Sequence, residues 1–265
     1  MSEFLISVIL GIIQGLTEFL PISSSGHLEL ANALLGDRKA LDSDLIIVIL
    51  AHLGTAFSIM YIYRSDILNI IKSMLFFRRD EHALLGWKIA VSAIPAVAIG
   101  LLLEEQISQI FEGDIIIVGV FLIITGIVLY LTPRKNERRD EVSFFRAGII
   151  GLAQAFAILP GISRSGMTIA TALFIGTDSK EAARFSFLMV LPIILGKVAL
   201  DLLTGDLTIS SATIYPISGA LISSFLVGIW ACRAMIRFVQ RGQLKYFAIY
   251  CLIVGAITIA FSLYG

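Results

Sequence analysis

The residues that could do chemistry gather in residues 14–27, QGLTEFLPISSSGH, which place a carboxylate, a run of hydroxyls and a histidine in an apolar N-terminal segment. The apolar stretches 4–13 and 28–35 on either side are each shorter than the roughly 20 residues that cross a bilayer. A polar loop between two half-length apolar pieces predicts a re-entrant hairpin, because irregular backbone at membrane depth is tolerated only where it lines a cavity. Ionisable side chains at that depth are costly, so Glu18 and His27 are candidate functional residues.

A second stretch of similar composition, GLAQAFAILPGISRSG, occupies residues 151–166. A shift of 140 residues aligns six identical pairs: Gly11 with Gly151, Gln14 with Gln154, Ser23 with Ser163, Ser25 with Ser165, Gly26 with Gly166 and Gly36 with Gly176. Small residues recur in any membrane helix because they pack well there, but six identities at one offset indicate a duplication. Repeats with interrupted helices in matching positions are typical of proteins that bind a ligand near the membrane midplane.

The composition excludes several classes of protein. Of the 265 residues, 57% are hydrophobic and 15% charged, which predicts an integral membrane protein. The formal net charge of +0 gives no reason to expect nucleic-acid binding. The two cysteines, Cys232 and Cys251, lie in or beside apolar segments, so neither a disulfide framework nor a zinc site is indicated.

Six apolar segments approach the length of a transmembrane helix: residues 45–63, 83–103, 115–131, 185–203, 214–232 and 247–264. Four connecting loops carry four, five, two and four Lys or Arg residues: 64–82, 132–146, 177–184 and 233–245. The connections 104–114 and 204–213 carry none, and only Arg38 and Lys39 follow the first hairpin. The positive-inside rule therefore assigns the four basic loops to the cytoplasm.

With this assignment the first hairpin, residues 4–35, starts and ends outside, whereas the second, residues 147–176, starts and ends inside. We therefore expect an all-α integral membrane protein with six transmembrane helices plus two re-entrant helix-loop-helix hairpins in an inverted-topology repeat. Hairpins that enter from opposite faces can bring their polar tips together near the midplane. The expected organisation is a single membrane domain, 1–265, with a first repeat 1–131, a cytoplasmic linker 132–146 and a second repeat 147–265.

The residue types at the two tips suit a phosphate ligand. Helix N-termini and Ser/Gly loops offer free N–H groups to an anion, and Arg164 adds a charged fork that binds phosphate in bidentate fashion. Gln14 and Glu18 are four residues apart and share a helix face, and a carboxylate with phosphate oxygens is a usual Mg²⁺ arrangement. His27 is close enough in sequence to a serine to act as acid or base. These residues predict phosphoryl transfer to a serine or to water.

Residues 14–27 and residues 159–168, LPGISRSGMT, resemble the two signatures of the undecaprenyl-diphosphatase family, also called bacitracin-resistance protein BacA. Residues 93–96 and 183–188 resemble its lesser blocks, so the resemblance covers nearly the whole chain. It implies a phosphatase that converts undecaprenyl diphosphate to the monophosphate and recycles the lipid carrier for cell-wall biogenesis. It also implies bacitracin resistance and a divalent cation, for which we expect Mg²⁺ with Ca²⁺ as the alternative.

Carried over residue by residue, the resemblance implies a set of roles. The expected catalytic residues are Glu18, Ser24, His27 and Arg164. The expected substrate-binding residues are Gln14, Ser23, Ser25, Ser163, Ser165 and Thr168, and the expected metal ligands are Glu18 and Gln14. The family has Glu or Gln at its first acidic position, and here Gln14 leaves Glu18 as the only carboxylate of the tip. Ser24 attacks the terminal phosphorus while His27 takes its proton, or a metal-activated water attacks directly; the sequence leaves both open.

The sequence also allows interpretations other than an enzyme. Glu18 and Arg164 could form an ion pair that only ties the hairpins together, and several hydroxyls could only cap half-helices. Inverted repeats with broken helices also suit a flippase or an ion-coupled transporter of phosphorylated polyprenyl lipids. The expected partners are a polyprenyl diphosphate lipid and the membrane, with a homodimer as a further candidate. The expected location is the plasma (cell inner) membrane, multi-pass, with the pocket facing outside.

Overall fold

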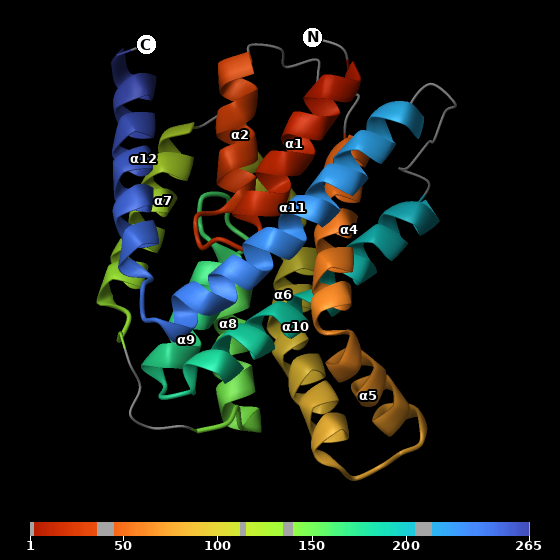
Figure 1. Ribbon diagram of the computed structural model, residues 1–265. Helices are drawn as coiled ribbons and strands as arrows, with labels where there is room; N and C mark the ends of the chain where they lie inside the picture. The colour runs from red at the N-terminus through yellow and green to blue at the C-terminus, as the bar shows by residue number, and fades with distance from the viewer. Residues whose placement is uncertain (1–2, 36–44, 112–114, 135–139, 205–213, 265) are drawn as a thin grey trace.

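The protein is built from α-helices. The computed structural model describes residues 3–35, 45–111, 115–134, 140–204 and 214–264, and all regular elements of that part of the chain are helical (Figure 1). This confirms the all-α prediction. Gly36, Arg38, Lys39 and part of the expected 132–146 linker lie outside the described residues. The helices are α1 (Glu3–Thr17), α2 (Ser24–Leu35), α4 (Leu45–Ile62), α5 (Arg64–Leu75), α6 (Glu81–Phe111), α7 (Ile115–Leu131), α8 (Phe144–Phe156), α9 (Arg164–Phe174), α10 (Ser179–Thr204), α11 (Ile214–Gln240) and α12 (Lys245–Tyr264).

Four helices in the described part of the chain are long and apolar enough to cross a membrane: α6, α10, α11 and α12. The pair α4 and α5 is a fifth candidate, although the chain bends by 84° between them. The expected span 115–131 forms α7 with those bounds, but its 17 residues fall just short of the same criterion. The structure thus supports a multi-pass helical membrane protein with four or five candidate spans, against the six expected from the sequence.

Each signature interrupts a helix. The first separates α1 from α2 after Thr17, and the second separates α8 from α9 after Phe156. In Figure 1, α1 and α2 extend from the end of the molecule where both chain termini lie, whereas α8 and α9 extend from the opposite end. The two breaks lie near the middle of the molecule. The sequence prediction of two helix-break-helix hairpins therefore matches the backbone.

The two breaks touch each other through matching residues. A Cβ atom built on Gly26 would lie 3.2 Å from the Cα of Gly161, and one built on Gly166 would lie 3.2 Å from the Cβ of Pro21. Adding 140 to residues 26 and 21 gives 166 and 161, so the two contacts are equivalent under the shift found in the sequence. Small residues at these positions let the two tips meet.

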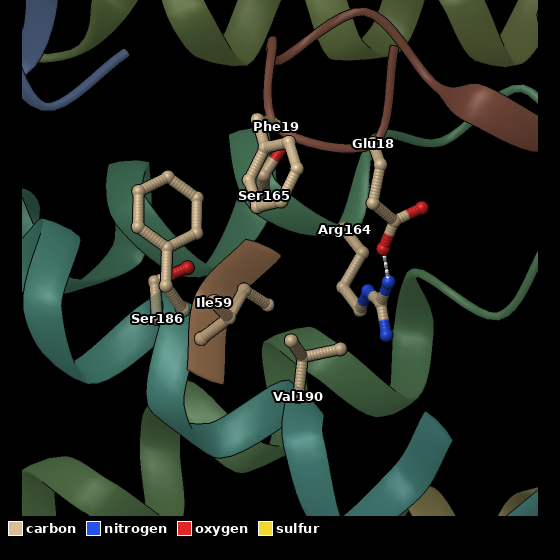
Figure 2. Close-up of a pocket in the computed structure, with 8 residues that line it drawn as sticks. Glu18, Phe19, Ile59, Arg164, Ser165, Ser186 and Val190 are labelled. Atoms are coloured by element: carbon tan, nitrogen blue, oxygen red, sulfur yellow. Dashed lines mark hydrogen bonds and ion pairs between the residues drawn. The ribbon is translucent and has the colours of Figure 1, made fainter. Parts of the chain in front are cut away.

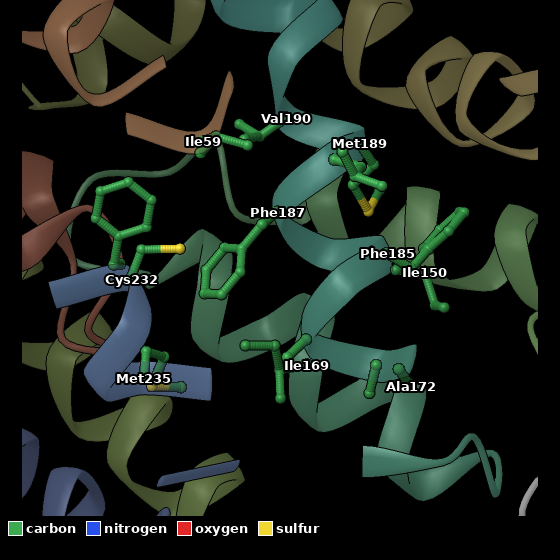
Figure 3. Close-up of a cluster of buried hydrophobic side chains, with 14 of the residues drawn as sticks. Ile59, Ile150, Ile169, Ala172, Phe185, Phe187, Met189, Val190, Cys232 and Met235 are labelled. Atoms are coloured by element: carbon green, nitrogen blue, oxygen red, sulfur yellow. The ribbon is translucent and has the colours of Figure 1, made fainter. Parts of the chain in front are cut away.

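The core is centred on α10, which carries the fully buried Phe185, Leu188 and Met189. Figure 3 shows Phe185 and Met189 of α10 among side chains of α4, α8, α9 and α11, including Ile150 and Met235. Since lipid tails are as apolar as leucine, such a core is held mainly by van der Waals packing rather than by exclusion of water. Ser186 and Phe187 lie on the same helix and face the site described below.

Two glycines let the hairpins pack tightly against long helices. A Cβ atom on Gly11 of α1 would lie 2.5 Å from the carbonyl oxygen of Ala220 on α11. A Cβ atom on Gly151 of α8 would lie 2.4 Å from the carbonyl oxygen of Ser92 on α6. Gly11 and Gly151 are again 140 residues apart, and each hairpin packs on a long helix from the other half of the chain.

We expect Gly151→Ala to destabilise the protein by about 1–3 kcal/mol, because overpacking forces backbone to move. Gly148→Ala, one turn earlier on α8, is the matched control, since a Cβ there has no atom within 4 Å. Alanine is the better helix former by about 1 kcal/mol, so the control should be neutral or stabilised. Thermal unfolding in detergent measures both variants, and equal unfolding temperatures would contradict the close approach of α8 and α6.

Candidate functional site

Glu18 is the centre of the site. Its side chain is buried at the end of α1, and its Oε1 forms an ion pair with the guanidinium of Arg164 at the start of α9 (Figure 2). Its Oε2 accepts hydrogen bonds from Gln14 Nε2 at 3.0 Å and from Ser24 Oγ at 2.9 Å. One carboxylate therefore joins residues of both signatures. The ion pair between the hairpins, considered from the sequence, is present.

The cavity at this cluster is small. It has a volume of about 10 Å³, which is room for about one water molecule. Its walls are Glu18, Phe19, Ile59, Arg164, Ser165, Ser186, Phe187 and Val190. Phe19 and Phe187 meet edge to face with their ring centres 5.6 Å apart and form part of its apolar lining. The free volume is therefore smaller than a phosphate group.

The tip of the first hairpin has a fixed, strained shape. Ser23 has a φ of 70°, a left-handed conformation that favours glycine and costs a non-glycine residue of order 1–3 kcal/mol. Its Oγ accepts a hydrogen bond from the N–H of Gly26 at 3.2 Å and lies 3.4 Å from Ser25 Oγ. Ser23 thus caps the start of α2, as the capping interpretation expects. Strain held by such contacts is typical of functional loops.

The second tip repeats these side-chain contacts, although Ser163 has an extended backbone with a φ of −79°. Ser163 Oγ accepts a hydrogen bond from the N–H of Gly166 at 3.1 Å and lies 3.3 Å from Ser165 Oγ. Ser163 is therefore the N-cap of α9. Ser165 Oγ in turn donates to the carbonyl oxygen of Leu20 at 3.3 Å, which links the second tip directly to the first.

Thr168 lies one turn beyond Arg164 and hydrogen-bonds to its backbone. Its Oγ1 donates to the carbonyl oxygen of Arg164 at 2.8 Å and lies 2.5 Å from Ser186 Oγ on α10. Since Thr168 is buried, its hydroxyl contacts the protein rather than the open space of the cavity. Thr168 therefore links the start of α9 to α10.

His27 makes its hydrogen bonds to Ser23 and Tyr250. Its Nδ1 lies 2.8 Å from the carbonyl oxygen of Ser23, which can only accept, so Nδ1 carries the proton of the neutral ring. Its Nε2 therefore accepts the hydrogen bond from the Tyr250 hydroxyl at 2.8 Å, and the two rings stack at 13°. Ser24, by contrast, donates to Glu18. The structure places the carboxylate of Glu18, and not the ring of His27, at the Ser24 hydroxyl.

Three residues join the site that the sequence did not indicate: Thr125, Ser186 and Tyr250. Thr125 Oγ1 accepts a hydrogen bond from the N–H of Ser163 at 3.1 Å and donates to the carbonyl oxygen of Gly161 at 3.2 Å. A single buried hydroxyl in the apolar helix α7 was a signal that could have pointed to Thr125. Tyr250 on α12 had no such signal, because it is one of three tyrosines in that apolar helix.

Oxygen atoms suited to a divalent cation are present at Gln14 and Glu18. The described residues contain no group of three His, Cys, Asp or Glu side chains that could hold a metal by themselves. Gln14 is fully buried, and its Oε1 has no hydrogen-bond partner among the described residues. Mg²⁺ commonly takes one or two protein oxygen ligands and completes its shell with phosphate oxygens and water. Gln14 and Glu18 fit a cation that arrives with a phosphate ligand.

Comparisons with known proteins agree with the geometry. The chain matches the family described as bacitracin resistance protein BacA over residues 7–257. It is 46% identical over 256 residues to a protein named undecaprenyl-diphosphatase from Christiangramia forsetii, with 97% of each chain covered. Proteins of the same name from Bacteroides fragilis and Methanosphaera stadtmanae are 40% and 37% identical, over 98% and 99% of each chain. Because these matches span nearly the whole sequence, the protein belongs to the bacitracin resistance protein BacA family.

Proposed function

We propose that this protein is a membrane phosphatase that hydrolyses undecaprenyl or another polyprenyl diphosphate to the monophosphate and inorganic phosphate. This activity would recycle the lipid carrier for cell-wall glycans and confer bacitracin resistance. The relatives that bear the name undecaprenyl-diphosphatase support it. The observation that carries it is the cluster at Glu18, where an anion-binding Arg164 and the hydroxyl of Ser24 share one carboxylate.

The diphosphate binds at the two tips. Arg164 offers a planar fork for phosphate oxygens, and the starts of α2 and α9 present free backbone N–H groups to an anion. Ser25 and Ser165 lie beside these helix starts. Because Glu18 pairs with Arg164 and little free volume remains beside them, the diphosphate takes the place of Glu18 at the guanidinium. Exchange of one anionic partner for another keeps the arginine charge compensated.

Ser24 is the proposed nucleophile. Its Oγ attacks the terminal phosphorus and its proton passes to Glu18 Oε2, which already accepts its hydrogen bond at 2.9 Å. The bond between that phosphorus and the bridging oxygen breaks, and the polyprenyl monophosphate leaves. Water then hydrolyses the phosphoserine and releases inorganic phosphate. The competing version, in which Glu18 orients a water that attacks directly, uses the same residues without the phosphoserine.

A divalent cation, for which we expect Mg²⁺ with Ca²⁺ as the alternative, belongs to the proposal. Gln14 Oε1 and the Glu18 carboxylate would hold it together with phosphate oxygens. When bound, it supplies positive charge that stabilises the charge developing on the phosphate oxygens. The hairpin residues have separate roles. Arg164 binds phosphate, and the capping residues Ser23 and Ser163 fix the two tips.

The full topology is also part of the proposal. We assign α7 as a sixth span next to the five candidates, and α1–α2 and α8–α9 as re-entrant hairpins of an inverted repeat. Two pairs of contacts equivalent under the 140-residue shift support the repeat, one at the tips and one at Gly11 and Gly151. The basic loops place the first hairpin, and the pocket, on the outer side of the plasma membrane. A homodimer stays a prediction.

We expect Ser24→Ala to reduce turnover by on the order of a thousandfold or more if the serine is the nucleophile. The direct-water version predicts a loss of about tenfold, because only one hydrogen bond to Glu18 disappears. Ser65→Ala on the exposed part of α5 is the control for loss of a hydroxyl. Phosphate release by both variants, with a search for phosphoserine in acid-quenched wild type, separates the two mechanisms.

Tyr250→Phe should lower kcat by about fivefold if His27 takes part in turnover through the hydrogen bond that it accepts from Tyr250, since one hydrogen bond is worth roughly 1 kcal/mol. The variant keeps the ring that stacks on His27 and removes only the hydroxyl that donates to Nε2. Tyr246→Phe, one turn earlier on α12, is the matched control. An unchanged kcat, together with an unchanged pH profile, would show that the His27–Tyr250 pair is only structural.

The rival function is transport of a phosphorylated polyprenyl lipid without hydrolysis. Liposomes that contain the purified protein and a polyprenyl diphosphate in one leaflet distinguish the two. If the protein is a phosphatase, we expect inorganic phosphate and polyprenyl monophosphate to appear and to increase in parallel. Appearance of intact diphosphate in the other leaflet, with no phosphate released, would overturn the proposal and favour the transporter.

A further inference from the structure

One corner of the molecule carries positive charge that no acidic residue of its own segments neutralises. Residues 115–134 and 214–265 contain no Asp or Glu at all. They contain five cationic residues, which are Arg134, Arg233, Arg237, Arg241 and Lys245. Within the described part of the chain, none of the five forms an ion pair with a carboxylate. We call the end of α7 and the start of α12, with the loop residues 132–134 and 241–244, the basic corner.

The basic corner encloses a second cavity, of about 120 Å³. A single water needs roughly 10–15 Å³ by the same measure, so this space admits a group of the size of a phosphate. Its walls are Leu129, Tyr130, Thr132, Pro133, Arg134, Gly242, Leu244 and Lys245. Arg134 and Lys245, two of these five cations, therefore border one cavity, and no carboxylate of the described residues borders it.

The backbone of this cavity is tightly held. Gly242 has a φ of 64°, and a Cβ there would lie 2.0 Å from the carbonyl oxygen of Arg134. The two loops that form the wall are thus in direct contact, and only glycine allows that approach. The cavity is a built feature of the fold at this corner. None of its walls belongs to the Glu18 cavity.

The surroundings place the cavity at the level of lipid headgroups. α12 and α7 are apolar helices, and the cavity lies where α7 ends and α12 begins. Tyr130 and Tyr246 are 65% and 54% exposed beside it. Exposed tyrosines are enriched at the boundary between membrane and water. Basic pockets between membrane helices on the cytoplasmic side bind anionic headgroups.

We propose that the basic corner binds the phosphate of an anionic phospholipid from the cytoplasmic leaflet, with Arg134 and Lys245 as its charged contacts. The cytoplasmic side follows from the topology under Proposed function, but the binding does not depend on the phosphatase activity. Free inorganic phosphate carries the same chemistry, so the test below separates the two sources. The exposed tyrosines and apolar helices favour the lipid.

The test titrates the detergent-purified full chain with dioleoyl phosphatidylglycerol, dioleoyl phosphatidylcholine or inorganic phosphate and records thermal unfolding. We expect phosphatidylglycerol to raise the unfolding temperature of the wild type and phosphatidylcholine to leave it unchanged. Each cation at such a surface contributes about 1 kcal/mol, roughly a fivefold change in affinity, so Arg134→Gln with Lys245→Gln should weaken binding about thirtyfold. Arg134→Lys, which keeps the charge, should stay within a few-fold of wild type.

The matched control is Arg233→Gln with Arg237→Gln, because both residues are exposed, lie on α11 and do not border the cavity. This control variant removes the same amount of charge, and its affinity for phosphatidylglycerol should lie within about threefold of the wild-type affinity. Equal weakening in the two double variants would show diffuse attraction and overturn the site. Stabilisation by inorganic phosphate alone, to the extent seen with lipid, would overturn the lipid assignment. If the double variant misfolds, the single variant Lys245→Gln, expected to bind about fivefold more weakly, decides instead.

Discussion

Replacement of Glu18 by glutamine is expected to lower kcat for phosphate release by about a hundredfold to ten-thousandfold. The change removes the group that accepts the Ser24 proton and the only carboxylate of the first tip. The new amide oxygen can still accept a hydrogen bond from Arg164, so the contact between the hairpins is partly kept. Steady-state phosphate release from a polyprenyl diphosphate in detergent measures the effect.

The loss must come from chemistry and not from unfolding. Removal of one partner of a buried ion pair costs about 3–5 kcal/mol, so the unfolding temperature of Glu18→Gln is measured alongside its activity. Glu29→Gln is the matched control, because Glu29 is exposed on α2 of the same hairpin and also loses one carboxylate. Near-native turnover of folded Glu18→Gln would contradict the proposed role of Glu18.

Replacement of Arg164 by alanine is the second variant with a large expected effect, a loss of about a thousandfold or more in kcat/KM. An arginine that stabilises the transferring phosphoryl group is worth about 10³–10⁵ in rate. Arg164 is also the only charged residue of the second tip and the partner of Glu18. Because it binds the ground-state diphosphate as well, KM should rise while kcat falls.

Arg164→Lys tests the geometry of the arginine. It keeps the charge but loses the planar fork, so its kcat/KM should lie between those of the wild type and the alanine variant. Arg233→Ala on the exposed side of α11 controls for loss of an arginine elsewhere. If kcat/KM of the lysine variant fell as far as that of the alanine variant, the positive charge alone would contribute nothing to turnover. That result would contradict the expected intermediate activity and the role of the Arg164 charge.

The hairpins and the centre of the site could be predicted from the sequence because local rules specify them. Pro21 cannot continue the first half-helix, which ends at Thr17, and the spacing of Gln14 and Glu18 brings their side chains together, where they are hydrogen-bonded. The 140-residue shift relates contacts that are equivalent in space, such as Gly26 with Gly161 and Gly166 with Pro21. The contact of Glu18 with Arg164 follows from two tips that meet in the middle of the molecule.

The partners from distant helices could not be predicted, because helix packing and not local pattern brings them to the site. Tyr250 reaches His27 across 223 residues, and Ser186 reaches Thr168 from α10. The sequence suggested His27 as the base for Ser24 from their nearness in the chain, whereas the turn of α2 directs the ring toward α12. The small cavity beside Glu18 was also not predictable, since Phe19 and Phe187, which pack against each other in its lining, come from distant segments.

The most direct test of the central claim is phosphate release by the purified wild-type protein from undecaprenyl diphosphate, with Mg²⁺ or with EDTA. We expect one inorganic phosphate and one undecaprenyl monophosphate for each lipid consumed in Mg²⁺, and almost no phosphate release in EDTA. Absence of phosphate release by well-folded protein, with Mg²⁺ and with Ca²⁺ and with several polyprenyl diphosphates, would contradict the phosphatase and favour lipid transport.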